Sequence, residues 1–193
     1  MAISNEKKRE MLLNTFELLK DDFDNNSSSL SSIIVKMLKI DVDTAVDMWS
    51  YLLKRYSSKV RDEDEAYDLC GSIMYDGENA IGMEKMGDII LGNSTLKKAL
   101  FGQSADDIAL YFGELIINKI DMNDLQTVDE ILNLVYNNKY KQNSWYDIME
   151  SVIPEDDEIQ VTEEALELLE MWCDKVTNAQ ERAKLNLKLM EFM

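Results

Sequence analysis

Residues Ile159-Gln-Val161, followed by Thr162, open a stretch with apolar residues at helical spacing, and the same I-x-[VM] form occurs three more times. The other copies are Ile40-Asp-Val42, Ile81-Gly-Met83 and Ile120-Asp-Met122. The leading isoleucines are 41, 39 and 39 positions apart. Three positions after them stand Asp43, Glu84, Asn123 and Thr162, and all but Glu84 are good helix N-caps. The repeat therefore predicts four helices that begin at regular intervals.

A second apolar segment with helical spacing follows each of these starts. The four second segments cover roughly residues 62–75, 104–118, 143–152 and 178–192, and Pro154 closes the third. One proline and seven glycines in 193 residues are few helix breakers, and no stretch alternates apolar and polar residues for long. The sequence therefore predicts an all-α protein whose unit is a pair of helices.

A period of about 40 residues with two helices per unit resembles the HEAT-like helical repeat proteins. The resemblance covers about residues 33–193 and consists of the triplet and the period. It implies helical hairpins stacked in an array, and a compact multi-helix bundle is the alternative. We expect one all-helical domain over 1–193, with N-terminal capping helices in 1–39 and about four helix-pair units in 40–193.

The first part of the chain differs from the repeats. A helix is expected from about residue 5 to 23, with apolar side chains along one side. The following stretch, Asn25-Asn-Ser-Ser-Ser-Leu-Ser-Ser32, is rich in residues that favour turns. It is predicted to form a loop in which a serine caps the next helix.

Acidic residues dominate the composition, and they are unevenly distributed. The chain has 38 acidic and 20 basic residues, a net charge of −18. Residues 1–60 are neutral overall, residues 61–120 carry −7 and residues 121–193 carry −11. Such a surface repels phosphate, so direct binding of nucleic acid or of an anionic membrane is not expected. A basic protein is the favoured partner.

The sequence lacks the residues that several common catalytic, metal-binding and phosphate-binding sites require. The chain has no histidine, so a Ser-His-Asp or Cys-His catalytic device and the usual zinc sites are excluded. No phosphate-binding glycine loop is present, and neither Asp41-x-Asp43 nor the Asp76 stretch completes a calcium-binding loop. Adjacent acids such as Asp106-Asp107 are expected by chance at this composition. We expect no cofactor, no metal and no enzymatic activity.

The remaining features favour a protein of the cytoplasm. Cys70 and Cys173 are far apart in the sequence and are expected to be buried, unpaired thiols. The N-terminus has charges but no apolar core of a secretory signal, and no apolar run is long enough to span a membrane. The three tryptophans are expected in the core.

One cluster of acids is arranged more regularly than the others. Glu163, Glu167, Glu170 and Asp174 are spaced i, i+4, i+7 and i+11, which places them in one line along a helix. The opposite side has a buried stripe of Ala165, Leu168, Leu169, Trp172 and Val176. Just upstream stand four more acids, Glu155, Asp156, Asp157 and Glu158. These eight residues are the predicted partner-binding surface.

The leading hypothesis is a non-enzymatic interaction protein whose acidic surface binds a basic, nucleic-acid-binding protein such as a nuclease. It would act as a phosphate mimic, in the manner of an inhibitor or immunity protein, and anti-CRISPR proteins and immunity proteins against nuclease toxins resemble this profile in composition. An adaptor that binds a peptide or helix through an apolar groove is the alternative. Two further hypotheses are that the charge serves only solubility, and that the protein is an enzyme with paired carboxylates.

Overall fold

Every regular secondary-structure element in the part of the chain that the structure describes is a helix. The computed structural model describes residues 3–104, 113–139, 141, 143–155 and 158–193, and these contain helices and turns but no strand. The predicted all-α class is therefore confirmed. None of the described helices is long and apolar enough to cross a membrane. The chain divides into two compact units, Met1–Gln103 and Ser104–Met193.

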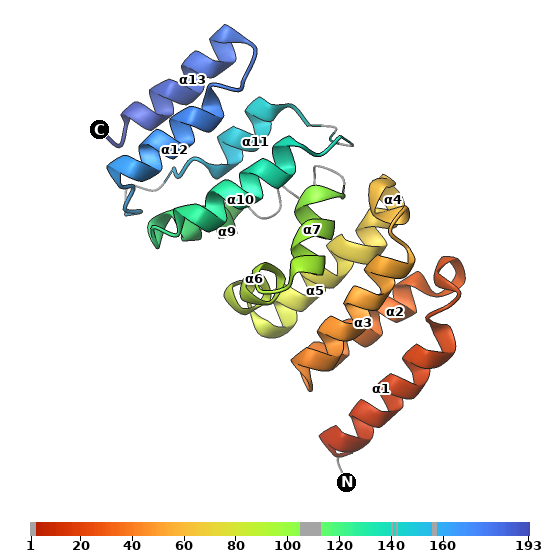
Figure 1. Ribbon diagram of the computed structural model, residues 1–193. Coiled ribbons are helices and arrows are strands. Elements are labelled where there is room, and N and C mark those ends of the chain that lie inside the picture. The colour runs from red at the N-terminus through yellow and green to blue at the C-terminus, as the bar shows by residue number, and fades with distance from the viewer. Residues whose placement is uncertain (1–2, 105–112, 140, 142, 156–157) are drawn as a thin grey trace. The chain divides into compact units, whose positions relative to one another are not determined.

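The first unit contains seven α-helices joined by short turns (Figure 1). They are α1 (Asn5–Leu19), α2 (Phe23–Leu38), α3 (Val42–Arg55), α4 (Glu63–Ala66), α5 (Ser72–Ile81), α6 (Met83–Leu91) and α7 (Ser94–Gly102). A 3₁₀ turn at Lys59–Arg61 precedes α4, and a π-helical turn at Tyr67–Gly71 joins α4 to α5. Helix α2 is the centre of this unit because it packs against α1, α3 and α5.

The core of the first unit consists of aliphatic side chains around one tryptophan. Leu30, Ile34 and Met37 of α2 and Ile73 of α5 are fully buried. Each such side chain contributes about 1.5–3 kcal/mol relative to an exposed position. Trp49 of α3 is also fully buried, and its indole Nε1 donates a 2.8 Å hydrogen bond to the backbone carbonyl of Leu69. This bond joins α3 to the π-helical turn without leaving a buried donor unpaired.

The second unit contains five described helices. They are α9 (Gly113–Asp121), α10 (Leu125–Tyr136), α11 (Trp145–Val152), α12 (Glu163–Cys173) and α13 (Ala179–Met190). Helix α11 packs on α9 and α13, while α10 packs on α12, so the helices form two layers (Figure 1). The layers are joined through contacts of α9 with α10, and of α12 with both α11 and α13. Within this unit, successive helices therefore alternate between layers.

The predicted loop at residues 25–32 is wrong, because these residues lie inside α2. Their local preference for turns is overridden by burial: Phe23, Leu30 and Ser31 all face the core. Two of the polar side chains donate hydrogen bonds to backbone carbonyls three or four residues earlier. Ser31 Oγ donates to the Ser28 carbonyl at 3.1 Å, and Asn26 Nδ2 donates to the Asp22 carbonyl at 2.8 Å.

The predicted N-caps are only partly correct. Thr162 caps α12 as expected, but α3 is capped by Asp41, α6 begins after Gly82, and α10 is capped by Asp124. At the third start, Asn123 takes a left-handed φ of 56°, so the helix begins one residue later. At the second start, the left-handed φ of 93° at Gly82 requires a residue without a Cβ.

The second helical segments are found at 143–152 and 178–192, as α11 and α13. The segment expected at 62–75 is divided among α4, the π-helical turn and α5. The segment expected at 104–118 lies partly outside the described residues, and α9 covers its last part. Helix α7 was not predicted as a separate element.

Candidate functional site

Helix α12 carries the predicted line of acids, and hydrogen bonds hold its N-terminal end. Thr162 Oγ1 accepts a 3.1 Å hydrogen bond from the backbone N–H of Ala165, which caps the helix. The same hydroxyl donates to Oδ1 of Asn123 at 2.9 Å, and the backbone N–H of Gln160 donates to Oδ1 of Asp121 at 2.8 Å. These bonds fix the start of α12 against the turn that precedes α10.

The inner side of α12 is buried largely as the sequence predicts. Ala165, Leu169, Trp172 and Val176 are all buried, whereas Leu168 is only half-buried. Cys173 is an additional buried residue of this side. This apolar stripe faces α10, α11 and α13, the three helices that α12 contacts. The opposite side is therefore turned away from the core.

Three aromatic residues pack together at the C-terminal half of α12. The rings of Tyr136, Trp145 and Trp172 lie with their centroids 5.0–5.8 Å apart. Trp145 Nε1 donates to the backbone carbonyl of Trp172 at 2.9 Å, and Trp172 Nε1 donates to Asp129 Oδ1 at 2.9 Å. Trp145 and Trp172 are buried, as is Trp49 in the first unit, which confirms the core assignment of all three tryptophans.

The four acids of the predicted line are all exposed. Glu163, Glu167 and Glu170 lie within α12, and Asp174 is its C-cap residue. None of the four forms an ion pair with a residue in the described part of the chain. Like charges at i, i+4 destabilise a helix by about 0.2–0.5 kcal/mol per pair. No ion pair with a described residue therefore compensates the repulsion along this face.

Lys175 is the cation next to the line in sequence, but it is bound elsewhere. Its ammonium group lies 4.9 Å from the ring centroid of Tyr136 and 5.0 Å from that of Trp172. Lys141 lies over the rings of Tyr136 and Trp145 at 4.8 and 5.6 Å. Cation–π contacts of this kind contribute about 0.5–1 kcal/mol at exposed sites. They hold both lysines on the aromatic cluster.

The upstream acids are less uniform than the sequence suggests. Glu155 forms an ion pair with Lys188 of α13 at 3.1 Å, and the same lysine lies 3.6 Å from Glu150. Glu158 is exposed and has a polar partner of its own. Asp156 and Asp157 lie outside the described residues. The acidic face is the line of exposed acids Glu163, Glu167, Glu170 and Asp174.

Both cysteines are buried free thiols, as expected. Burial raises the pKa of Cys70 well above the ordinary value. Burial, together with the negative charges of Asp174 and Glu170, raises the pKa of Cys173 to about 12. Both groups are therefore neutral at physiological pH. Among the described residues, no three Cys, Asp or Glu side chains gather in a geometry that could hold a metal ion.

Comparison with known proteins gives no relative. No protein-family model matches the chain, and no curated protein and no solved structure matches it.

Proposed function

We propose that the protein is a non-enzymatic binding protein whose acidic face on α12 docks on the basic surface of a nucleic-acid-binding protein. The observation that carries the proposal is the line of four exposed carboxylates with no ion-pair partner among the described residues. A basic partner would relieve their mutual repulsion. The apolar stripe and the aromatic cluster beneath them hold the face in position before any partner arrives.

The net charge of the unit that contains α12 also favours a basic partner. Residues 104–193 contain 20 acidic and seven basic residues, a net charge of −13. A field of this sign attracts a positively charged surface over about a Debye length, 8–10 Å in physiological salt. It raises the association rate and disfavours partners of like charge. Salt would therefore weaken the complex mainly by slowing its formation.

The carboxylates of the acidic face can be compared in spacing with the phosphates that they would mimic. Eleven residues of helix rise about 16 Å, so consecutive acids are about 5–6 Å apart along the axis. Phosphates are about 3.4 Å apart along one strand of B-DNA, and duplex charge is twice as dense. The face is thus sparser than a nucleic-acid backbone. We infer that the partner is recognised through the summed negative field, and that its nucleic-acid site is blocked by occupancy.

A comparison of capture by three forms of the protein tests the proposal. The wild-type chain, the variant E163Q/E167Q/E170Q/D174N and the control D43N/D47N/D76N/E84Q are used as baits in lysate of the native host. The control changes four exposed carboxylates of the first unit and therefore alters the net charge equally. Captured proteins are quantified by mass spectrometry at low and at moderate salt.

The proposal predicts a basic protein that is captured by the wild type and the control, lost with the α12 variant, and weakened at moderate salt. Purified wild-type protein should then displace nucleic acid from that partner, and the α12 variant should not. Equal capture by all three baits would contradict the proposal. Capture that is insensitive to salt would instead favour the adaptor with an apolar groove.

A further inference from the structure

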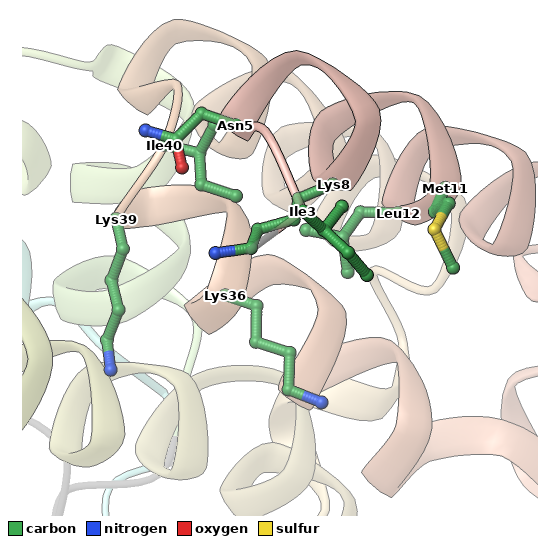
Figure 2. Close-up of a pocket in the computed structure, with 8 residues that line it drawn as sticks. All are labelled: Ile3, Asn5, Lys8, Met11, Leu12, Lys36, Lys39 and Ile40. Carbon is green, nitrogen blue, oxygen red and sulfur yellow. The ribbon is translucent and has the colours of Figure 1, made fainter. Parts of the chain in front are cut away.

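One hollow of the first unit combines an apolar wall with three lysines. It lies between the N-terminal half of α1 and the C-terminal end of α2, and its volume is about 390 Å³ (Figure 2). Its apolar wall is formed by Ile3, Met11, Leu12 and Ile40. Ile3 and Met11 are about half exposed, at 55 % and 51 %. The wall therefore leaves hydrocarbon surface in contact with water, which is unfavourable.

Three lysines surround this apolar wall. Figure 2 shows Lys8 on the α1 side and Lys36 and Lys39 on the α2 side. No carboxylate lines the hollow, although the chain has nearly twice as many acidic as basic residues. The three ammonium groups form no ion pair with any residue of the described ranges. The hollow is thus a local reversal of the sign of the protein's charge.

Two of the acids that are close in sequence to these lysines are engaged by other cations. Glu10 pairs with Lys7 at 2.9 Å. Asp41 accepts from Arg9 Nε at 2.6 Å and from the hydroxyl of Thr44 at 2.6 Å. Glu10 and Asp41 are therefore held by their own partners, and the lysines of the hollow stay available to an anion from solution.

The size of the hollow limits what it can hold. An α-helix is about 10 Å across and rises 5.4 Å per turn, so 390 Å³ corresponds to about one turn. A helix docked in a groove uses anchors over at least two turns. The volume instead falls within the range of small-molecule sites, about 300–1,000 Å³. Such sites typically combine an apolar wall with a small number of polar or charged groups, as this hollow does.

We propose that this hollow binds a small amphiphilic carboxylate, with its hydrocarbon chain on Ile3, Met11, Leu12 and Ile40 and its carboxylate among Lys8, Lys36 and Lys39. This binding site is separate from the acidic face and lies in the other unit. Charge complementarity selects the anion, and the apolar wall selects a hydrocarbon body over an inorganic ion. The ligand would also cover the apolar surface that α1 and α2 leave exposed.

The test uses methionine methyl groups as local probes. The full chain is labelled with ¹³C at its methionine methyl groups, and M11L assigns the Met11 signal. Octanoate is titrated below its micelle-forming concentration, and octanol is titrated as the uncharged analogue. Met171, which is exposed on α12, reports non-specific contact with the amphiphile. Octanoate should shift the Met11 signal in a saturable manner and leave the Met171 signal in place.

Two triple variants separate a specific site from general charge. K8Q/K36Q/K39Q should weaken octanoate binding by about tenfold or more, because charge-assisted contacts are lost. K54Q/K85Q/K98Q removes three other exposed lysines of the same unit and should leave the affinity within about twofold. Octanol should bind the wild type more weakly than octanoate does.

Three results would overturn the proposal. These are an unmoved Met11 signal at saturating octanoate, equal shifts with octanoate and octanol, or equal effects of the two triple variants. A Met11 signal that moves with protein concentration alone would assign the hollow to contact with a second copy of the chain. Far-ultraviolet circular dichroism of each variant verifies that it is folded, so a negative result refers to binding.

Discussion

Thr162 donates a hydrogen bond from its hydroxyl group to Oδ1 of Asn123 at 2.9 Å, and the two residues occupy equivalent positions in consecutive repeats. Each stands three positions after the isoleucine that opens its unit. The hydrogen bond from Gln160 to Asp121 joins a second equivalent pair, one position after the isoleucines. The 39-residue period in the sequence is therefore expressed as contact between like positions.

Substitution of Thr162 should destabilise the protein measurably. T162A removes the N-cap of α12 and the bond to Asn123, and N-cap losses cost about 0.5–2 kcal/mol. T162S keeps the hydroxyl and should cost less. T177A, at an exposed position four residues past the end of α12, is the control and should change the free energy of unfolding by less than about 0.5 kcal/mol. Urea unfolding monitored by circular dichroism gives the comparison, and equal values for T162A and T177A would refute the role of the cap.

Acid should weaken the link between α1 and α3. Hydrogen bonds from Thr44 and Arg9 lower the pKa of Asp41 to about 2, from an ordinary value of about 4. Because the folded-state pKa is depressed, the stability that Asp41 contributes is complete above about pH 4 and is lost as the pH falls toward 2. D41N should therefore be less stable than the wild type at neutral pH, and the difference should shrink in this window. The unfolding midpoint in urea from pH 2 to 7 measures it, with D43N as control. A constant difference across the series would contradict the assignment.

Salt should stabilise the fold. Residues 121–193 carry 17 acids and six bases, and the four acids of the acidic face have no ion-pair partner among the described residues. Screening shortens the range of their repulsion, from about 30 Å at 0.01 M salt to about 10 Å at 0.1 M. The melting temperature should rise over this range in sodium chloride. It should rise less in the variant E163Q/E167Q/E170Q/D174N. A melting temperature that stays flat or falls would indicate that attractive pairs outweigh repulsion.

The two thiols should be protected in the folded protein. Cys70 and Cys173 are buried, and burial raises the pKa of both, which suppresses the reactive thiolate. Ellman's reagent at pH 8 should therefore modify the native chain far more slowly than the chain in denaturant. Single variants C70A and C173A distinguish the sites. Modification of either native thiol at the rate of the unfolded chain would contradict its burial.

The sequence predicts the parts of the fold that depend on periodic burial. The stripe of Ala165, Leu169 and Trp172 has helical spacing, and α12 forms where that spacing occurs. It fails where local propensity and tertiary burial disagree, as at residues 25–32, because Leu30 and Ser31 are buried by packing that no local pattern reveals. Helix starts shift by one or two residues for a similar reason, since a left-handed residue such as Asn123 is set by its surroundings.

The two candidate sites also differ in how far the sequence predicts them. The acidic face lies on one helix, so spacing alone predicts that its members share a side. The hollow at Lys8, Lys36 and Lys39 combines two helices, and its lysines lie up to 31 positions apart in the sequence. Lys7 and Arg9 pair with two nearby acids, Glu10 and Asp41, and the Arg9–Asp41 pair depends on the folded arrangement. A neutral N-terminal third in an acidic chain is the only sequence signal for the hollow.

The docking role of the acidic face is tested by the affinity of the purified chain for its captured basic partner, measured for the wild type and the two charge variants. Exposed charge pairs contribute about 0.2–1 kcal/mol each, so loss of four should weaken binding by about fourfold or more. E163Q/E167Q/E170Q/D174N should show this loss, while D43N/D47N/D76N/E84Q should bind within about threefold of the wild type. If both variants weaken binding equally, the acidic face is no docking site and only the net charge matters.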